Sequence, residues 1–190
     1  MKLENVVLVQ GHHENLLRTN RGCVNDVISV LSGCPEVRDD PPCVCPILNQ
    51  FSIIVNDLSL PEDSTRLRTD KLVPLIPLLM ESVNPELETA RFELVLSKGL
   101  ELQGNYGYRC TKQEWDTFNY VHSTSLPSLF GVNLENTSIL INDPMEQVTF
   151  FLKAYEILRE ACLLGLTPSD IEEKQVKYTE VVNRTMETST

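Results

Sequence analysis

Apolar residues recur every three or four positions through most of the chain, which is the spacing of α-helices that bury one face. The clearest example follows Pro46, which suits a first helical turn because that position needs no N–H donor. An alternating strand would instead leave Leu48 and Ile54 facing water. We therefore predict a central helix over residues 43–57. Its apolar face consists of Ile47, Phe51, Ile54, Val55 and Leu58, and its polar side of Asn49, Gln50, Ser52, Asn56 and Asp57.

Capping residues mark where further helices begin and end. Helix starts are predicted at Cys23, Ser59, Asn84, Thr111, Asp143 and Thr167, and glycine stops at Gly33, Gly99 and Gly165. Pro74 and Pro77 interrupt the apolar stretch 72–80, so we predict a kink or two short pieces there. The helix that begins at Thr111 is expected to bury Trp115 and Phe118.

The helical pattern is absent from three stretches. Residues 99–110 contain three glycines and predict an ordered loop, and residues 123–136 have an irregular pattern. Residues 138–141 are a candidate for a short strand that pairs with residues 5–9. We predict a mainly α fold, a compact multi-helix domain over residues 1–166 with at most one short β pair.

Composition and charge narrow the range of partners. The net charge of −11 disfavours a nucleic-acid backbone or an anionic membrane surface as the ligand. No apolar run approaches the roughly 18 residues of a membrane span, and the apolar block near the N-terminus is too short for a signal peptide. We therefore expect a cytoplasmic protein whose six cysteines are thiols rather than disulfides.

The densest group of reactive side chains is Cys34, Cys43 and Cys45. Thiolates are zinc ligands, and His12 or His13 would supply a fourth ligand, so a structural zinc site is one interpretation. The spacing speaks against it, because zinc-binding cysteine pairs stand about two to four residues apart. Here the three cysteines are separated by eight residues and by one. The other interpretation is that they are small buried side chains and bind no cofactor.

A thiol nucleophile is a further alternative, since a helix N-terminus lowers the pKa of an exposed cysteine such as Cys43 or Cys45. This chemistry needs a base, and His12, His13 and His122 are the three histidines in the sequence. His122 lies on the apolar face of its predicted helix, a position typical of a packing residue. The sequence contains no P-loop, dinucleotide fingerprint, nucleophile elbow or HExxH motif.

Part of the chain resembles a group of known proteins. Its order of motifs is Cys43-Val44-x-Pro46, Phe51, Asn56-Asp57, Leu72-x-Pro74-Leu75-Ile76-Pro77 and the arginine-led Arg91-Phe92-Glu93-Leu94-Val95-Leu96. Over residues 22–97 this order is similar to that of uncharacterised helical proteins of bacteria and phages. The chain departs from them in having Cys45 where serine is usual and in lacking the Asp-Trp of a later helix. The resemblance implies a helical, intracellular fold; it implies no activity and assigns no site residues.

Taken together, the patterns favour a non-enzymatic protein-interaction or assembly subunit, in the setting of a phage, another mobile element or a bacterium. Abundant apolar helix faces and the lack of a convergent polar motif support it. The last helix, within residues 167–190, has a thin apolar face and is predicted to be peripheral or to face a partner. The expected partner is another protein or a second copy of the chain. The alternatives are a small-molecule-binding or thiol-dependent enzyme using Cys43 or Cys45, and a structural zinc site.

Overall fold

A computed structural model describes residues 5–11, 13, 15–107 and 128–187 of the chain. Helices form nearly all of its regular structure, as the sequence predicts. The α-helices are α1 Leu16–Thr19, α2 Val24–Leu31, α3 Pro46–Asp57, α4 Arg66–Leu72, α5 Ile76–Leu79, α6 Pro85–Asn105, α8 Ser128–Leu140, α9 Pro144–Leu163 and α10 Pro168–Glu187. Two 3-10 turns, η2 Glu62–Ser64 and η3 Val73–Leu75, and two strands, β1 Val7–Leu8 and β2 Arg21–Gly22, complete the described elements. The predicted helix that starts at Thr111, with Trp115, Phe118 and His122, lies outside the described residues.

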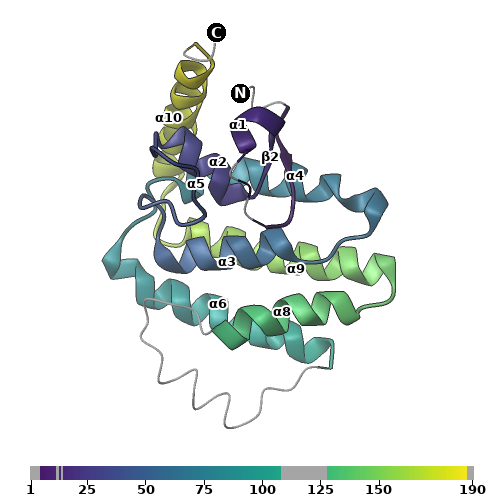
Figure 1. Cartoon of the computed structure of the whole chain (residues 1–190). Helices are drawn as coiled ribbons and strands as arrows, with labels where there is room; N and C mark the ends of the chain where they lie inside the picture. The colour runs from purple at the N-terminus through teal and green to yellow at the C-terminus, as the bar shows by residue number, and fades with distance from the viewer. Residues whose placement is uncertain (1–4, 12, 14, 108–127, 188–190) are drawn as a thin grey trace.

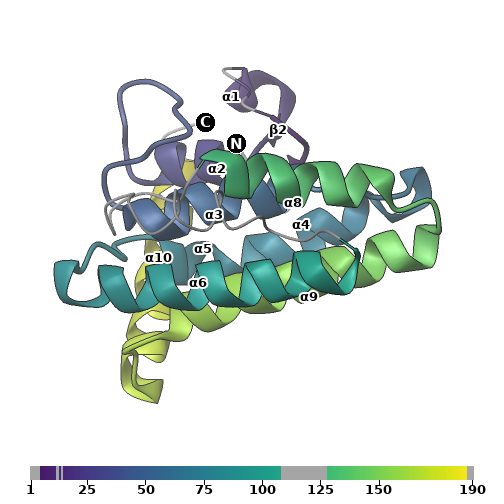
Figure 2. The ribbon, with the colours of Figure 1, turned by 90° about the horizontal axis from the view of Figure 1, so that it is seen from below.

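Four long helices form the body of the molecule. α3, α6, α8 and α9 lie side by side with roughly aligned axes (Figures 1 and 2). α6 packs against α9, α3 and α8, and α3 also contacts α9, α8 and α2. α10 crosses this body steeply at one end and packs on α5 and α2. The central position of α3 confirms that this helix organises the core.

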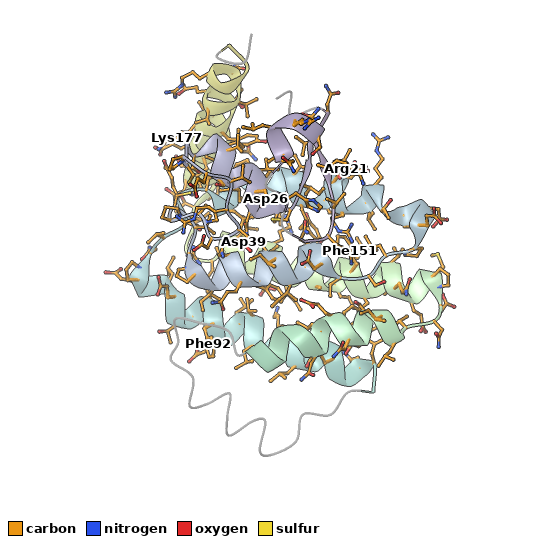
Figure 3. The ribbon with its side chains drawn as sticks, viewed as in Figure 1. Arg21, Asp26, Asp39, Phe92, Phe151 and Lys177 are labelled. Carbon is orange, nitrogen blue, oxygen red and sulfur yellow. The ribbon has the colours of Figure 1, made fainter. Side chains whose placement is uncertain are left out.

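The face of α3 that was predicted to be apolar is buried. Ile47, Phe51 and Val55 have no exposed surface, and Pro46 occupies the first helical turn as expected. Phe151 of α9, which is labelled in Figure 3, lies in the same core and is also fully buried. Removing each such large side chain from water contributes about 1.5–3 kcal/mol before the entropy of folding is subtracted.

The polar side of α3 is also largely buried, which the sequence analysis did not predict. Asn25 of α2 donates from its amide to the carbonyl of Asn49 over 3.2 Å and accepts a hydrogen bond from the Ser52 hydroxyl. Asn56 donates to the carbonyl of Val9, beside β1, over 2.8 Å. These polar residues are therefore an internal interface with α2 and the N-terminal segment, rather than a solvated face.

The strand prediction was wrong in its location. Residues 138–140 belong to α8, whose Leu134, Thr137 and Ser138 point inward at helical spacing. The small sheet instead pairs β1 with β2 in parallel, with Val7 opposite Arg21. The buried face of α8 includes the polar residues Thr137 and Ser138, so it does not appear in the sequence as an apolar helical pattern. The short apolar run at 139–141 was therefore interpreted as a strand.

Two predicted loops are also helical where the structure describes them. α6 continues through Gly99 and Gly104 to Asn105, and α8 begins at Ser128, inside the stretch interpreted as irregular. Gly99 is buried within α6, and Leu102, three residues later, is buried as well. A glycine inside a helix costs about 1 kcal/mol relative to alanine, and the burial of neighbouring apolar side chains offsets that cost.

The N-terminus of α2 is tied to the loop that precedes it. The buried Asp26 carboxylate, labelled in Figure 3, accepts the N–H groups of Cys23 and His13 over 2.8 and 3.0 Å. Cys23 in return accepts the N–H of Asp26 on its sulfur, which completes a capping box. Gly33, just past the helix, has a φ of 71° and ends it as predicted.

A sharp turn between α5 and α6 joins the start of α3 to α6. We call residues Met80, Glu81 and Ser82 the 80–82 turn. The Ser82 N–H donates to the carbonyl of Cys43, and the Ser82 hydroxyl oxygen accepts the N–H of Cys45 over 2.9 Å. Arg91 of α6 is only 2% exposed, and its guanidinium donates to the carbonyl of Ser82 over 2.7 Å.

The same turn holds α10. Glu81 adopts a left-handed backbone conformation with a φ of 53°, which turns its carbonyl and that of Met80 toward Lys174. The Lys174 ammonium donates to these two carbonyls over 2.7 and 3.2 Å, and burial lowers its pKa. Lys177, labelled in Figure 3, pairs with the Glu81 carboxylate at 2.6 Å. α10 is therefore anchored to the 80–82 turn through Lys174 and Lys177.

We expect Ser82→Ala to lower the free energy of unfolding by about 1–3 kcal/mol, because it leaves the buried N–H of Cys45 without its acceptor. The matched control is Ser97→Ala on α6, an exposed serine whose loss is expected to change stability by no more than about 0.5 kcal/mol. Urea unfolding of both variants measures the difference. Equal, small losses would show that the turn does not hold the start of α3.

Candidate functional site

The structure places the three predicted metal-binding cysteines in different local environments. Cys45 is fully buried at the N-cap of α3. Cys43 is half-buried, with its sulfur 3.1 Å from the hydroxyl of Ser32. Cys34 is half-buried just after α2, where its N–H donates to the carbonyl of Ser29.

No group of three or more His, Cys, Asp and Glu side chains suited to a metal ion occurs among the described residues. His13 has a ring nitrogen 2.9 Å from the carbonyl oxygen of Gln10, while His12 and His122 lie outside the described ranges. The described part of the chain thus gives the zinc hypothesis at Cys34, Cys43 and Cys45 no support, and it stays a prediction.

Two other cysteines are poor nucleophiles because their environments disfavour the thiolate. Burial, and to a smaller extent the charge of Asp26, raises the pKa of Cys23 far above its usual range. Burial raises the pKa of Cys162 to about 12, although Arg91 nearby opposes the shift. Since Cys45 is enclosed as well, a reagent or substrate has no direct approach to these three sulfurs.

A pair of carboxyl groups lies where α3 meets α8. The Asp57 carboxylate accepts the N–H of Gly11 and the side-chain amide of Asn56, each over 2.8 Å. The pKa of Glu135 is raised, first by burial and then by the charge of Asp57. Because Asp57 is already bound by donors of the chain itself, this carboxylate is explained by its role in holding the N-terminal segment to α3.

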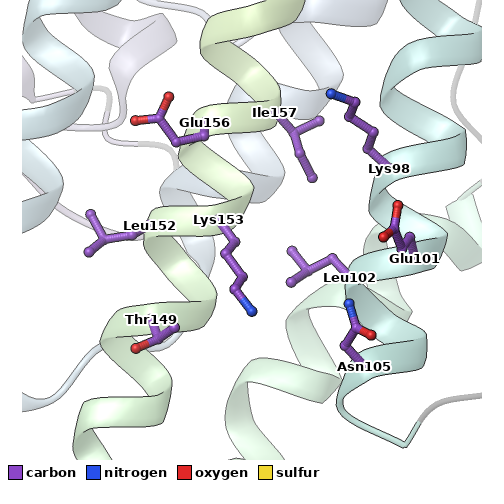
Figure 4. A pocket seen from close by; sticks show the side chains of 9 residues that line it. All are labelled: Lys98, Glu101, Leu102, Asn105, Thr149, Leu152, Lys153, Glu156 and Ile157. Carbon is purple, nitrogen blue, oxygen red and sulfur yellow. The ribbon is translucent and has the colours of Figure 1, made fainter.

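The α6–α9 groove is an open hollow of about 550 Å³ between two antiparallel helices (Figure 4). α6 lines it with Lys98, Glu101, Leu102 and Asn105, and α9 lines it with Thr149, Leu152, Lys153, Glu156 and Ile157. Each set follows the spacing of one helix face. Its apolar residues are Leu102 and Ile157, which are only 4 and 7% exposed, and half-buried Leu152. The Lys153 side chain reaches into the space between the two helices (Figure 4).

Charges on the rim of the groove are arranged unevenly. Lys98 is neutralised by an ion pair with Glu160 at 2.5 Å, and the Lys153 ammonium lies 5.7 Å from the centre of the Tyr106 ring. Glu101 and Glu156 stand on opposite rims, one from each helix. The groove is therefore lined by charges of both signs, two lysines and two glutamates.

A second hollow, of about 660 Å³, lies between β1 and α4. Its wall is more polar, with Thr65, Thr69 and the exposed Arg66–Asp70 ion pair at 3.7 Å. A surface ion pair of this kind is weak and makes no pocket for chemistry. This hollow also has apolar lining, from Val7, Val73 and Pro74, so both hollows combine apolar and polar side chains.

An apolar corner stands where α8 ends and α9 begins. Ile139, Leu140 and Met145 are 63, 77 and 73% exposed, and we call these three residues the apolar corner. The neighbouring Ser138 is buried and accepts the N–H of Ser59 on its hydroxyl oxygen, which fixes how α8 is turned. Large apolar side chains that gather in this way mark interaction surfaces more often than single exposed ones do.

Sequence reasoning missed both surfaces. The groove depends on α6 extending past Gly99 and on its pairing with α9, and neither is visible in the local pattern. The corner was hidden because residues 138–141 were assigned to a strand. The usable signal was Asp143, whose carboxylate accepts the N–H groups of Met145 and Glu146 and so fixes the start of α9.

The comparisons with known proteins give no relative. The sequence matches no protein-family model and no curated protein, and no solved structure matches the fold. None of the described helices combines the length and the apolar character that a membrane span requires.

We expect Cys34 and Cys43 to react with an alkylating reagent in the native protein. Cys23, Cys45 and Cys162 are expected to react at least about tenfold more slowly. Burial of the last three sulfurs is the reason. Site-resolved mass spectrometry measures each rate, and the urea-unfolded chain, in which all thiols are open, is the control. Labelling of Cys45 in the native state as fast as Cys34 would reopen a thiol-based activity.

Glu135→Gln is expected to raise the melting temperature at neutral pH. A raised pKa means that the folded state holds the Glu135 proton more tightly than the unfolded state does, so its favourable contribution is present in acid. That contribution is lost as the pH rises through the folded-state pKa. The gain should therefore vanish in acid, where the protonated Glu135 and the glutamine that replaces it are both uncharged. Melting curves across the acidic range test this; a gain independent of pH would contradict it.

Proposed function

We propose that this protein is a non-enzymatic protein-interaction or assembly subunit. The observation that carries the proposal is the apolar corner, where three large side chains stand in water at the junction of two helices. Exposing them is unfavourable by the same hydrophobic effect that builds the core, and a protein partner would bury them. The α6–α9 groove is a second hollow, lined by charges of both signs over a largely buried apolar floor.

The state of the reactive side chains supports a binding role over a chemical one. Cys45 is enclosed, and the Asp57 carboxylate is bound by the chain itself. Buried Arg91 and half-buried Lys174 donate hydrogen bonds to carbonyls of the 80–82 turn. These four polar groups are thus engaged by other parts of the chain.

The setting belongs to the same proposal. The resemblance to bacterial and phage proteins makes a phage, mobile-element or bacterial assembly the expected context, and the cytoplasm the expected compartment. The partner is a protein or a second copy, and neither nucleic acid nor a membrane, since a net charge of −11 repels both kinds of anionic surface.

A photo-crosslinking residue placed at Leu140, in cells that make the protein naturally, is expected to give discrete adducts with a protein partner. The same residue at Glu172, an exposed position on α10, is the matched control and should give none of them. Adding Met145→Asp to the Leu140 probe should remove the adducts, because it places a charge in the apolar corner.

Electrophoresis and mass spectrometry identify the adducts. No adduct from position 140, or the same adducts from positions 140 and 172, would sink the proposal. A purely self-linked adduct would identify the assembly as homo-oligomeric.

A further inference from the structure

Large apolar side chains stand in water at two separate places on the described surface. One place is the apolar corner. The other lies around α1 and β2, which contact each other, where Leu17 is 60% and Val7 is 42% exposed. Val7 is paired with Arg21 across the small sheet. We call Val7, Leu17, Arg18 and Arg21 the N-terminal tip.

The N-terminal tip is basic. Arg18 and Arg21 are exposed, and the ion pairs formed among the described residues all involve other side chains. Residues 5–11, 13 and 15–25 contain no acidic side chain, and Glu14 lies outside the described ranges. Two guanidinium groups therefore accompany the exposed apolar side chains of the tip and have no carboxylate partner in the part of the chain that the structure describes.

The apolar corner is acidic. Ser59 donates its N–H to the Ser138 hydroxyl, so the segment that leads into η2 lies beside the end of α8. Residues 57–65 and 134–148, which meet at this end of the molecule, contain acidic side chains and no lysine or arginine. The acidic residues are Asp57, Glu62, Asp63, Glu135, Asp143 and Glu146. Glu62 and Glu146 are exposed, and neither belongs to an ion pair within the described ranges.

The apolar corner is also held in shape by the chain itself. Gln147 donates to the carbonyl of Ile141 over 2.8 Å, and the Asp143 carboxylate caps α9. A surface that is ordered before binding loses little conformational entropy when a partner covers it. The corner and α1 lie at different ends of the molecule (Figures 1 and 2), so the tip of one chain can reach only the corner of another.

We propose that copies of this chain associate head to tail, with the N-terminal tip of one copy on the apolar corner of the next. This inference rests on the proposed function and names the occupant of its main surface. The apolar side chains of the two surfaces cover each other, and Arg18 and Arg21 pair with Glu62 and Glu146. Because the two surfaces differ, each bound copy leaves one of each free. Association therefore continues as a filament or closes into a ring.

The charge of the whole chain opposes this association but does not decide it. Each copy carries −11, whereas the two contact surfaces carry opposite charges. At physiological ionic strength the screening length is about 8 Å, so repulsion between distant exposed charges is weakened more than attraction across a contact. A contact made by so few side chains is weak, and we expect its extent to depend on protein concentration.

Two variants of the full chain test the contact by complementation. Leu140→Glu places a carboxylate in the corner and leaves the tip intact, and Leu17→Glu does the reverse. In analytical ultracentrifugation the mass of the wild type should rise with concentration. Each variant alone should have a Kd for self-association that is at least about tenfold higher. Their equal mixture should form a dimer and nothing larger, because only one intact tip and one intact corner can meet.

The matched control is Val176→Glu, which introduces the same charge at a 56% exposed position on α10 and should associate as the wild type does. A second pair of variants tests the charges. Glu62→Lys with Glu146→Lys reduces the net negative charge, yet it should weaken self-association at least about tenfold, because arginines then face lysines. Mixing this chain with one that carries Arg18→Glu and Arg21→Glu should restore association.

A wild type that stays monomeric at every concentration would overturn the inference, and so would a mixture of the Leu140 and Leu17 variants that stays monomeric. Dimers of Leu17→Glu alone would show that corner meets corner, which also overturns it. Unchanged or tighter association of the Glu62 and Glu146 variant would do the same for the charge pairing. Each of these results leaves the proposed function standing if the Leu140 probe captures a different protein in cells. Failure of both experiments would remove both proposals.

Discussion

The fold depends on how the carbonyl groups of the 80–82 turn are satisfied. Met80 and Glu81 direct their carbonyls to the ammonium of Lys174, and Ser82 directs its own to the guanidinium of Arg91. Arg91 is buried, and a buried cation is costly unless donors and acceptors meet with good geometry. The turn supplies one such acceptor, the Ser82 carbonyl, while the Nε atom of Arg91 is buried without a hydrogen-bond partner among the described residues. As a result the first residues of α3, the body of α6 and the crossing of α10 are all fixed at one place.

That arrangement explains why the core could be recognised from the sequence while its polar contacts could not. The apolar face of α3 follows helical spacing, and Asn84 and Asp143 are caps whose side chains accept the expected N–H groups. Burial of Asn49, Ser52 and Asn56 needs α2 and the N-terminal segment beside them. The local sequence pattern therefore predicts the apolar face of a helix. Whether its polar face is buried depends on segments that are distant in the sequence.

The candidate surfaces, too, depend on contacts between segments that are distant in the sequence. Cysteines stand out in a sequence because they are rare and reactive, but here Cys45 is a buried cap position and Cys23 part of a capping box. The α6–α9 groove is made of ordinary leucines, lysines and glutamates. These residues can be recognised as the lining of one groove only when α6 is known to continue past Gly99 and to lie antiparallel to α9. Helix-wide spacing on two elements, rather than any single motif, was the relevant signal.

The hydrogen bond from Lys174 to Met80 joins positions that are synthesised at very different times. Met80 emerges from the ribosome 94 positions before the lysine that binds its carbonyl. Until then water must hydrate that carbonyl, and α5 and α2 lack the helix that packs across them. Such a long-range closure leaves the nascent body incomplete until α10 has been synthesised. A chain that ends before α10 would therefore lack the partner of the Met80 and Glu81 carbonyls. Such a chain would be a substrate for cellular proteases and chaperones.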